Sequence, residues 1–125
     1  MIRLFLCVSG LIFLGYGVAC ALDPQLPARL AGLQIMSGDG YAEMGAMYGG
    51  LQTGFGLFCL VAAFSPRLHQ SALILLLLCI GCLAILRAGS TLRVDLLVTS
   101  YTWAALAFET FVTAVAAWLL LRGNR

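Results

Sequence analysis

Long apolar runs divide the chain into four segments of about membrane-spanning length. The runs cover roughly 4–22, 42–64, 71–90 and 99–121. Crossing the hydrocarbon core of a bilayer takes about 20 residues of helix, and a backbone in lipid has to satisfy its own hydrogen bonds. The pattern therefore predicts an all-α fold, an integral membrane four-helix bundle with antiparallel up-down topology, and a single membrane domain over 1–125.

Polar and turn-forming residues collect in three connections of unequal length. The long one, 23–41, contains Pro24 and Pro27 and closes with the turn sequence Ser-Gly-Asp-Gly at 37–40. Between these signals, leucines recur at helical spacing. This spacing predicts a short helix lying along the membrane surface, with an apolar stripe made by Leu26, Leu30 and Leu33.

Composition supports the bilayer as the solvent of this chain. Hydrophobic residues make up 62% of it and charged residues 10%, whereas a soluble domain has about 25% charged residues. All seven basic residues are arginines and the net charge is +2, which excludes the clustered basic surface of a nucleic-acid-binding protein. We expect the lipid bilayer as a partner and no nucleic acid.

The arginines also predict an orientation. Cytoplasmic loops carry an excess of basic residues. Four arginines fall on the side of the termini, and fewer fall on the other side. This count predicts a multi-pass protein with both termini in the cytoplasm; the four residues are Arg3, Arg67, Arg122 and Arg125.

The second apolar run carries two rows of small residues at helical spacing. Small residues at such positions let helix backbones approach closely in lipid. We therefore expect this helix to have close neighbours on two sides. One row is Gly45, Gly49, Gln52 and Gly56, and the other is Glu43, Met47, Gly50, Gly54 and Leu57.

Three ionisable residues lie inside the runs, namely Glu43, Arg87 and Glu109. Charges inside a span are expensive unless they are paired or hydrated, and they mark candidate functional sites. In antiparallel spans all three fall in the outer half of the bundle, and we expect Arg87 to pair with Glu109. The alternative is structural: a helix N-terminus stabilises the Glu43 carboxylate, and a buried Arg87–Glu109 pair serves packing alone.

The five cysteines all lie in apolar runs, which favours buried free thiols. Cys79 and Cys82 form a C-x-x-C pair that is typical of thiol- or quinone-linked oxidoreductases. Their place near the middle of the third run keeps them from an aqueous thiol partner, so we do not favour this function. A lone histidine, His69, has no neighbouring ligands, so we expect neither a metal nor a cofactor, and no enzyme activity.

The sequence resembles a family of small, four-span bacterial membrane proteins catalogued as a domain of unknown function. The resemblance rests on the E-x-x-x-M-Y-G-G motif over 43–50, on Arg87 and on Glu109, and it covers most of the chain. The connection containing Arg93 and Asp95 departs from the Gly/Pro-rich turn of that family. The resemblance implies the four-span architecture and a location in a bacterial inner (cytoplasmic) membrane, and it supplies no reaction.

Together these patterns favour a membrane protein with a polar pocket in its outer half. The pocket would bind a lipid headgroup or a small amphipathic ligand, or handle a proton; its residues would be Glu43, Tyr48, Gln52, Arg87 and Glu109. The alternative is an accessory subunit that packs its glycine and aromatic faces against a larger membrane protein or forms a homo-oligomer.

Overall fold

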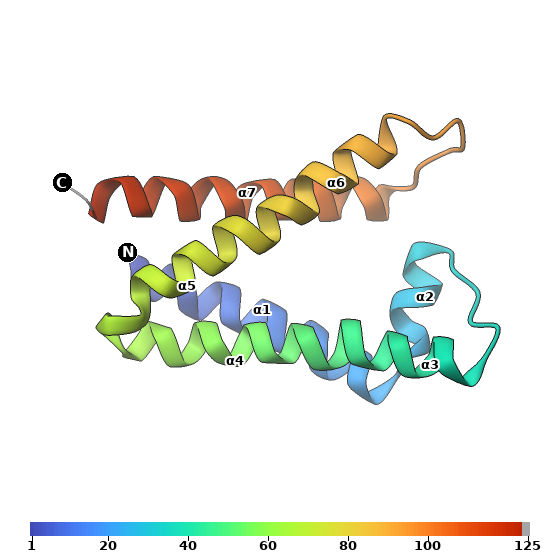
Figure 1. Ribbon diagram of the computed structural model, residues 1–125, viewed down its shortest axis with the longest axis horizontal. Helices are drawn as coiled ribbons and strands as arrows, with labels where there is room; N and C mark the ends of the chain where they lie inside the picture. Colours follow the sequence, from blue (N-terminus) through green and yellow to red (C-terminus); the bar gives the residue numbers. More distant parts are fainter. Residues whose placement is uncertain (124–125) are drawn as a thin grey trace. The chain divides into compact units, whose positions relative to one another are not determined.

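The computed structural model describes residues 1–123, and all their regular structure is helical (Figure 1). Four helical stretches are long and apolar enough to cross a membrane, and they lie within a few residues of the predicted runs. The expected all-helical membrane fold with four spans is therefore confirmed. The four stretches are Ile2–Leu22, Gly38–Phe64, Pro66–Thr91 and Ser100–Gly123. Arg125, which entered the arginine count, lies outside the described residues.

Two of the four spans contain a wide π-helical turn. The first span is the single helix α1 (Ile2–Leu22), and the fourth is α7 (Ser100–Gly123). The second joins α3 (Gly38–Met44), the π-helical turn η1 (Gly45–Gly50) and α4 (Leu51–Phe64). The third joins the short 3₁₀ turn η2 (Pro66–Leu68), α5 (His69–Leu75), the π-helical turn η3 (Leu76–Ile80) and α6 (Gly81–Thr91).

Two prolines set where the first and second spans end. Asp23 follows α1 and Ser65 follows α4, and neither has helical backbone angles. Each of these residues precedes a proline, Pro24 or Pro66. Because a proline ring clashes with a helical residue before it, the sequence forces a turn at each point.

The long connection contains the predicted short helix, α2 (Gln25–Ala31). It ends at Gly32, whose φ of 69° is the left-handed conformation that glycine adopts most readily. Leu33 therefore lies beyond the helix, and only two of the three expected leucines belong to it. The location of α2 at the membrane surface stays a prediction.

The second span begins earlier than the apolar pattern indicated. The Ser37 side chain accepts a hydrogen bond of 3.1 Å from the Gly40 N–H and caps α3. Asp39 is therefore the acid in the first helical turn, and Glu43 lies further along the helix. The interpretation of Glu43 as a first-turn acid favoured by the helix N-terminus was wrong, because Ser37 starts the helix upstream.

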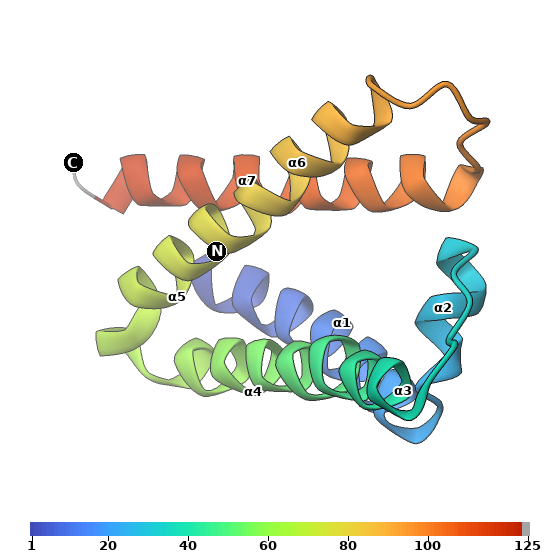
Figure 2. The same ribbon diagram turned by 45° about the vertical axis from the view of Figure 1, so that its right-hand side comes forward.

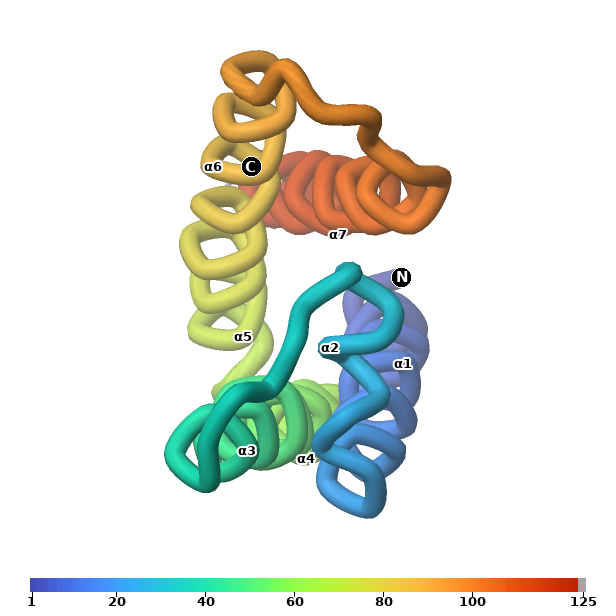
Figure 3. Tube along the Cα trace, turned by 90° about the vertical axis from the view of Figure 1, so that its right-hand side faces the viewer, coloured from blue at the N-terminus to red at the C-terminus, as the bar shows by residue number. Residues whose placement is uncertain are grey.

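The chain forms two compact units, residues Met1–Leu68 and a second unit that begins at His69. The single-domain interpretation stays a prediction. In the first unit α1 lies alongside α4 (Figures 1 and 3). The two helices are antiparallel, because the Arg3 guanidinium carbon at the start of α1 lies 4.5 Å from the ring centroid of Phe64 at the end of α4.

Close backbone contact holds α1 against the second span. A Cβ atom added to Gly49 would lie 2.9 Å from the Ala21 Cα, and one added to Gly56 would overlap the Leu14 backbone. Gly45 makes an ordinary contact with the Pro24 ring. One of the two predicted glycine rows therefore faces α1.

The other glycine row has no such contact. Nothing lies within 4 Å of a Cβ added to Gly54, and one added to Gly50 meets only its own helix, at Gly45. The neighbouring members Met47 and Leu57 are exposed, at 47% and 51% of their surface. The packing expected for this row stays a prediction.

Two glycines of α1 also belong to this close contact with the second span, and they were not predicted from the sequence. A Cβ on Gly17 would overlap the backbone at Gln52 and Thr53, and one on Gly10 would lie 3.0 Å from the Gly56 carbonyl oxygen. The signal was available in the spacing, since Gly10 and Gly17 are separated by the same seven positions as Gly49 and Gly56. A seven-residue repeat keeps one seam facing a partner helix.

The second unit pairs α7 with the α5–α6 span (Figure 2). The pairing is antiparallel, because Gly81 contacts Thr113 while Arg87, further along α6, contacts the earlier residue Glu109. A Cβ on Gly81 would lie 3.2 Å from the Thr113 methyl group. The small residue at 81 thus lets α6 approach α7 beside the ion pair.

A glycine substitution tests the α1–α4 contact. Gly56→Ala should lower the unfolding free energy by about 1–3 kcal/mol, the usual cost of overpacking, because the Leu14 backbone cannot move aside as a flexible side chain does. Gly54→Ala is the matched control on the open row and should cost nothing. Denaturation in detergent micelles, followed by circular dichroism, measures both; equal stability of the two variants would contradict the contact.

An ion pair at the end of α1 predicts a pH dependence. Asp23 accepts hydrogen bonds from Arg29 at 2.5 Å and from the Gln25 N–H at 3.1 Å, and the Arg29 hydrogen bond lowers the pKa of Asp23 below its usual range. The pair therefore stabilises α2 above about pH 4 and loses this effect as the pH falls through the lowered pKa.

Hydrogen exchange of the amides of α2 (Gln25–Ala31) measures the effect. After correction for intrinsic rates, protection should fall between neutral pH and pH values below the lowered pKa. Asp23→Asn should abolish the pH dependence and leave weaker protection throughout, whereas Asp39→Asn in α3 should behave as the unmodified chain. An unchanged pH profile in Asp23→Asn would show that the pair does not hold α2.

Candidate functional site

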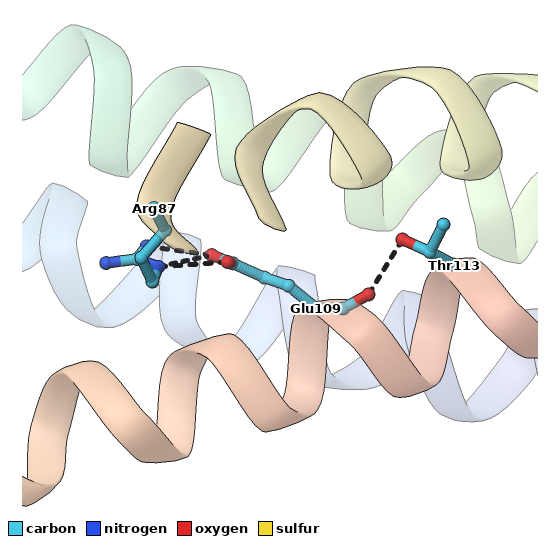
Figure 4. A network of polar contacts seen from close by, with 3 residues as sticks. All are labelled: Arg87, Glu109 and Thr113. Carbon is cyan, nitrogen blue, oxygen red and sulfur yellow. Dashed lines mark hydrogen bonds and ion pairs between the residues drawn. The ribbon is translucent and has the colours of Figure 1, made fainter. Parts of the chain in front are cut away.

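The third and fourth spans are joined by a two-pronged ion pair between Arg87 and Glu109 (Figure 4). The Arg87 Nη2 donates to Glu109 Oε1 at 2.7 Å, and Nε donates to Oε2 at 2.9 Å and to Oε1 at 3.1 Å. This parallel arrangement is the strong geometry of an arginine with a carboxylate. The expected Arg87–Glu109 pair is therefore present.

Helix geometry and small neighbours bring the two side chains together. Arg87 lies about one turn before the end of α6, on the side of the helix where Gly81 and Ala84 are buried. Glu109 shares the buried side of α7 with Val112 and Ala116. Small side chains at 81, 84 and 116 leave the helices close enough for the two long side chains to meet.

Thr113 supports the site without touching the carboxylate. Its Oγ1 donates a hydrogen bond of 2.7 Å to the Glu109 backbone carbonyl, one turn earlier on α7 (Figure 4). This local bond satisfies the hydroxyl inside the span. The Thr113 methyl group is then directed at Gly81, so the residue fills the contact between the helices.

The pair is asymmetric in exposure. The Glu109 side chain is 9% exposed and the Arg87 side chain 29%. At about 1.5 Å per residue, Glu109 lies about 13 Å along α7 from Ser100. A charge at this depth needs a partner, and Glu109 obtains one from Arg87, whose side chain as a whole is less deeply buried.

The other three predicted pocket residues belong to the first unit. Glu43 is exposed on α3, and Tyr48 and Gln52 are half-buried on η1 and at the start of α4. The structure thus brings together Arg87 and Glu109 within one unit. A pocket that combines all five residues stays a prediction.

Cys79 and Cys82 are free thiols and both are exposed, so the expectation of buried thiols was wrong for this pair. Cys79 lies in the π-helical turn η3 and Cys82 at the start of α6, inside the third span. Their exposed sides therefore face what surrounds the span. The redox interpretation is not carried further, since a thiol within a span is remote from aqueous exchange partners.

The ion pair predicts that single and double substitutions change the unfolding free energy differently. Arg87→Met or Glu109→Met alone should lower the unfolding free energy by up to about 3–5 kcal/mol, because one charge stays in the span without its partner. Substituting both residues by methionine should recover most of the loss. Denaturation in mixed micelles measures the cycle, with Thr110→Ala on the exposed side of α7 as a silent control. A double variant as unstable as the sum of the singles would contradict the pairing.

A comparison with known proteins places the chain in one family. A family model described as a domain of unknown function (DUF4345) matches residues 1–120. Searches among curated proteins and among solved structures find no significant match.

Proposed function

Since the chain belongs to the DUF4345 family, whose function is unknown, we propose a function from its site: Arg87 and Glu109 bind the polar headgroup of a lipid or small amphipathic molecule within the membrane. The chain is a small multi-pass membrane protein. Its location in a bacterial inner membrane, which the family resemblance implies, is part of the proposal. So is the cytoplasmic location of both termini, which rests on the arginine count.

The observation that carries the proposal is an ion pair inside a span, in which the arginine side chain stays partly exposed. Apolar residues of similar size join buried helices as well as an ion pair does, or better, so packing alone does not require these charges. A guanidinium binds phosphate and carboxylate groups in the same two-pronged way that it binds Glu109. The Arg87 side chain is 29% exposed, and a headgroup would approach it from this exposed side.

The arrangement also explains how a charged headgroup would be tolerated in lipid. Arg87 and Glu109 neutralise each other when no ligand is present, so the empty site carries little net charge. A headgroup that approaches Arg87 meets a fixed cation whose position is set by the carboxylate. The site is therefore preorganised, which lowers the cost of binding.

The double substitution described above separates binding from packing. The chain is purified in a mild detergent and its intact mass is measured with bound small molecules. We expect the unmodified chain to retain an amphipathic molecule, and Arg87→Met/Glu109→Met to lose it while keeping a similar unfolding midpoint. Retention in a stable double variant would show that the pair is structural only.

Glu43→Gln tests the larger pocket in the same measurement. A reduced occupancy in Glu43→Gln, without loss of stability, would add the first unit to the site. Unchanged occupancy would restrict the site to the second unit. Ala42→Ser, a neighbouring exposed substitution on α3, is the matched control.

A second candidate function is that of an accessory subunit of a larger membrane protein. It is favoured by the glycine row of the second span that does not face α1. Gly50 and Gly54 are four apart and have no neighbouring element within contact. This spacing is the small-residue motif through which spans associate in lipid. Stoichiometric co-purification of a larger protein, lost in Gly54→Leu and kept in the double methionine variant, would establish this function instead.

A further inference from the structure

The connection between α6 and α7 carries an apolar surface that neither the ion pair nor the packing uses. Residues 92–99 are not helical. Four of their side chains are large, apolar and exposed: Leu92 by 84%, Val94 by 43%, Leu96 by 77% and Leu97 by 101%. A water-exposed turn of this length would normally be polar, so the apolar content requires an explanation.

The position of the connection in the chain identifies what lies next to it. It starts directly after the third span ends at Thr91 and finishes where the fourth begins at Ser100. Both ends are therefore at the boundary of the bilayer, and a connection this short stays near that boundary. Tyr101 and Trp103 follow at once, and tyrosine and tryptophan are enriched at the level of the lipid headgroups.

The pattern within the connection fits a surface that is wet on one side and apolar on the other. Arg93 and Asp95 alternate with Leu92, Val94 and Leu96. Charged side chains near the end of a span turn toward the headgroups and water, because hydrocarbon is costly for them. The charged residues can then remain in water while the apolar ones enter the membrane.

We propose that residues 92–98 lie in the lipid interface of the outer side, with the side chains of Leu96 and Leu97 inserted among the upper acyl chains. Their backbone stays at the headgroup level, because irregular backbone cannot be exposed to the hydrocarbon core. The partner of this surface is the bilayer itself. An inserted connection also draws the end of α6 into the membrane and keeps Arg87 below the headgroups, where its pairing with Glu109 matters most.

Depth-dependent fluorescence quenching tests the insertion. Trp103 and Trp118 are replaced by phenylalanine and Leu97→Trp supplies the only tryptophan, in vesicles of phosphatidylcholine with phosphatidylglycerol. The probes are phosphatidylcholines brominated near the carbonyl end or near the methyl end of the chain, and aqueous iodide. We expect stronger quenching by the shallow bromine than by the deep one, and severalfold weaker quenching by iodide than for Asp95→Trp in the same background.

Two results would overturn the proposal. Quenching of Leu97→Trp by iodide as strong as that of Asp95→Trp would show a hydrated turn. Protection from both bromine positions and from iodide would show that protein covers the segment, either another part of this chain or a second copy. Because tryptophan itself favours the interface, Leu97→Cys and Asp95→Cys are compared as well, in a chain whose native cysteines are serines. A charged maleimide should label Leu97→Cys severalfold more slowly in the same vesicles; equal rates would also overturn the insertion.

Discussion

A charge in hydrocarbon has to meet its counter-charge, and this requirement determines how the third and fourth spans pair. Arg87 and Glu109 make three hydrogen bonds between α6 and α7. If the neighbouring residue took the place of either partner, its side chain would start about 1.5 Å away along the helix axis and about 100° around it. The ion pair therefore fixes both the depth and the rotation of α7 against α6.

The first unit sets the register of its two spans without charged residues. Helices in lipid gain little from hydrophobic burial, so close packing has to provide the attraction. Gly17, Gly49 and Gly56 let the backbones of α1 and the second span touch. A contact between backbones has one register, since each glycine fits only where the neighbouring chain comes closest. The two units thus reach a defined register through sterics in one case and through electrostatics in the other.

The sequence predicts the spans well because the bilayer leaves few choices. Helix length, the prolines after Asp23 and Ser65, and the absence of charges over long runs are local signals. The Arg87–Glu109 pair was also predictable, because Glu109 lies too deep to reach water and Arg87 is the cation of the neighbouring span. The glycines of α1, the start of α3 at Ser37 and the π-helical turns were not foreseen, since each depends on contacts or hydrogen bonds that a straight helix drawn from the sequence does not contain.

The described fold explains some residues of the E-x-x-x-M-Y-G-G motif and leaves others without a structural role. Met47, Tyr48, Gly49 and Gly50 all lie in the π-helical turn η1, and such turns frequently mark functional sites. Packing requires Gly49, because the Ala21 backbone leaves no room for a side chain. Nothing from a neighbouring element requires Gly50, and Glu43 is an exposed acid on a span. The α1 contact thus accounts for Gly49 in the motif, whereas Gly50 and Glu43 are not accounted for by it.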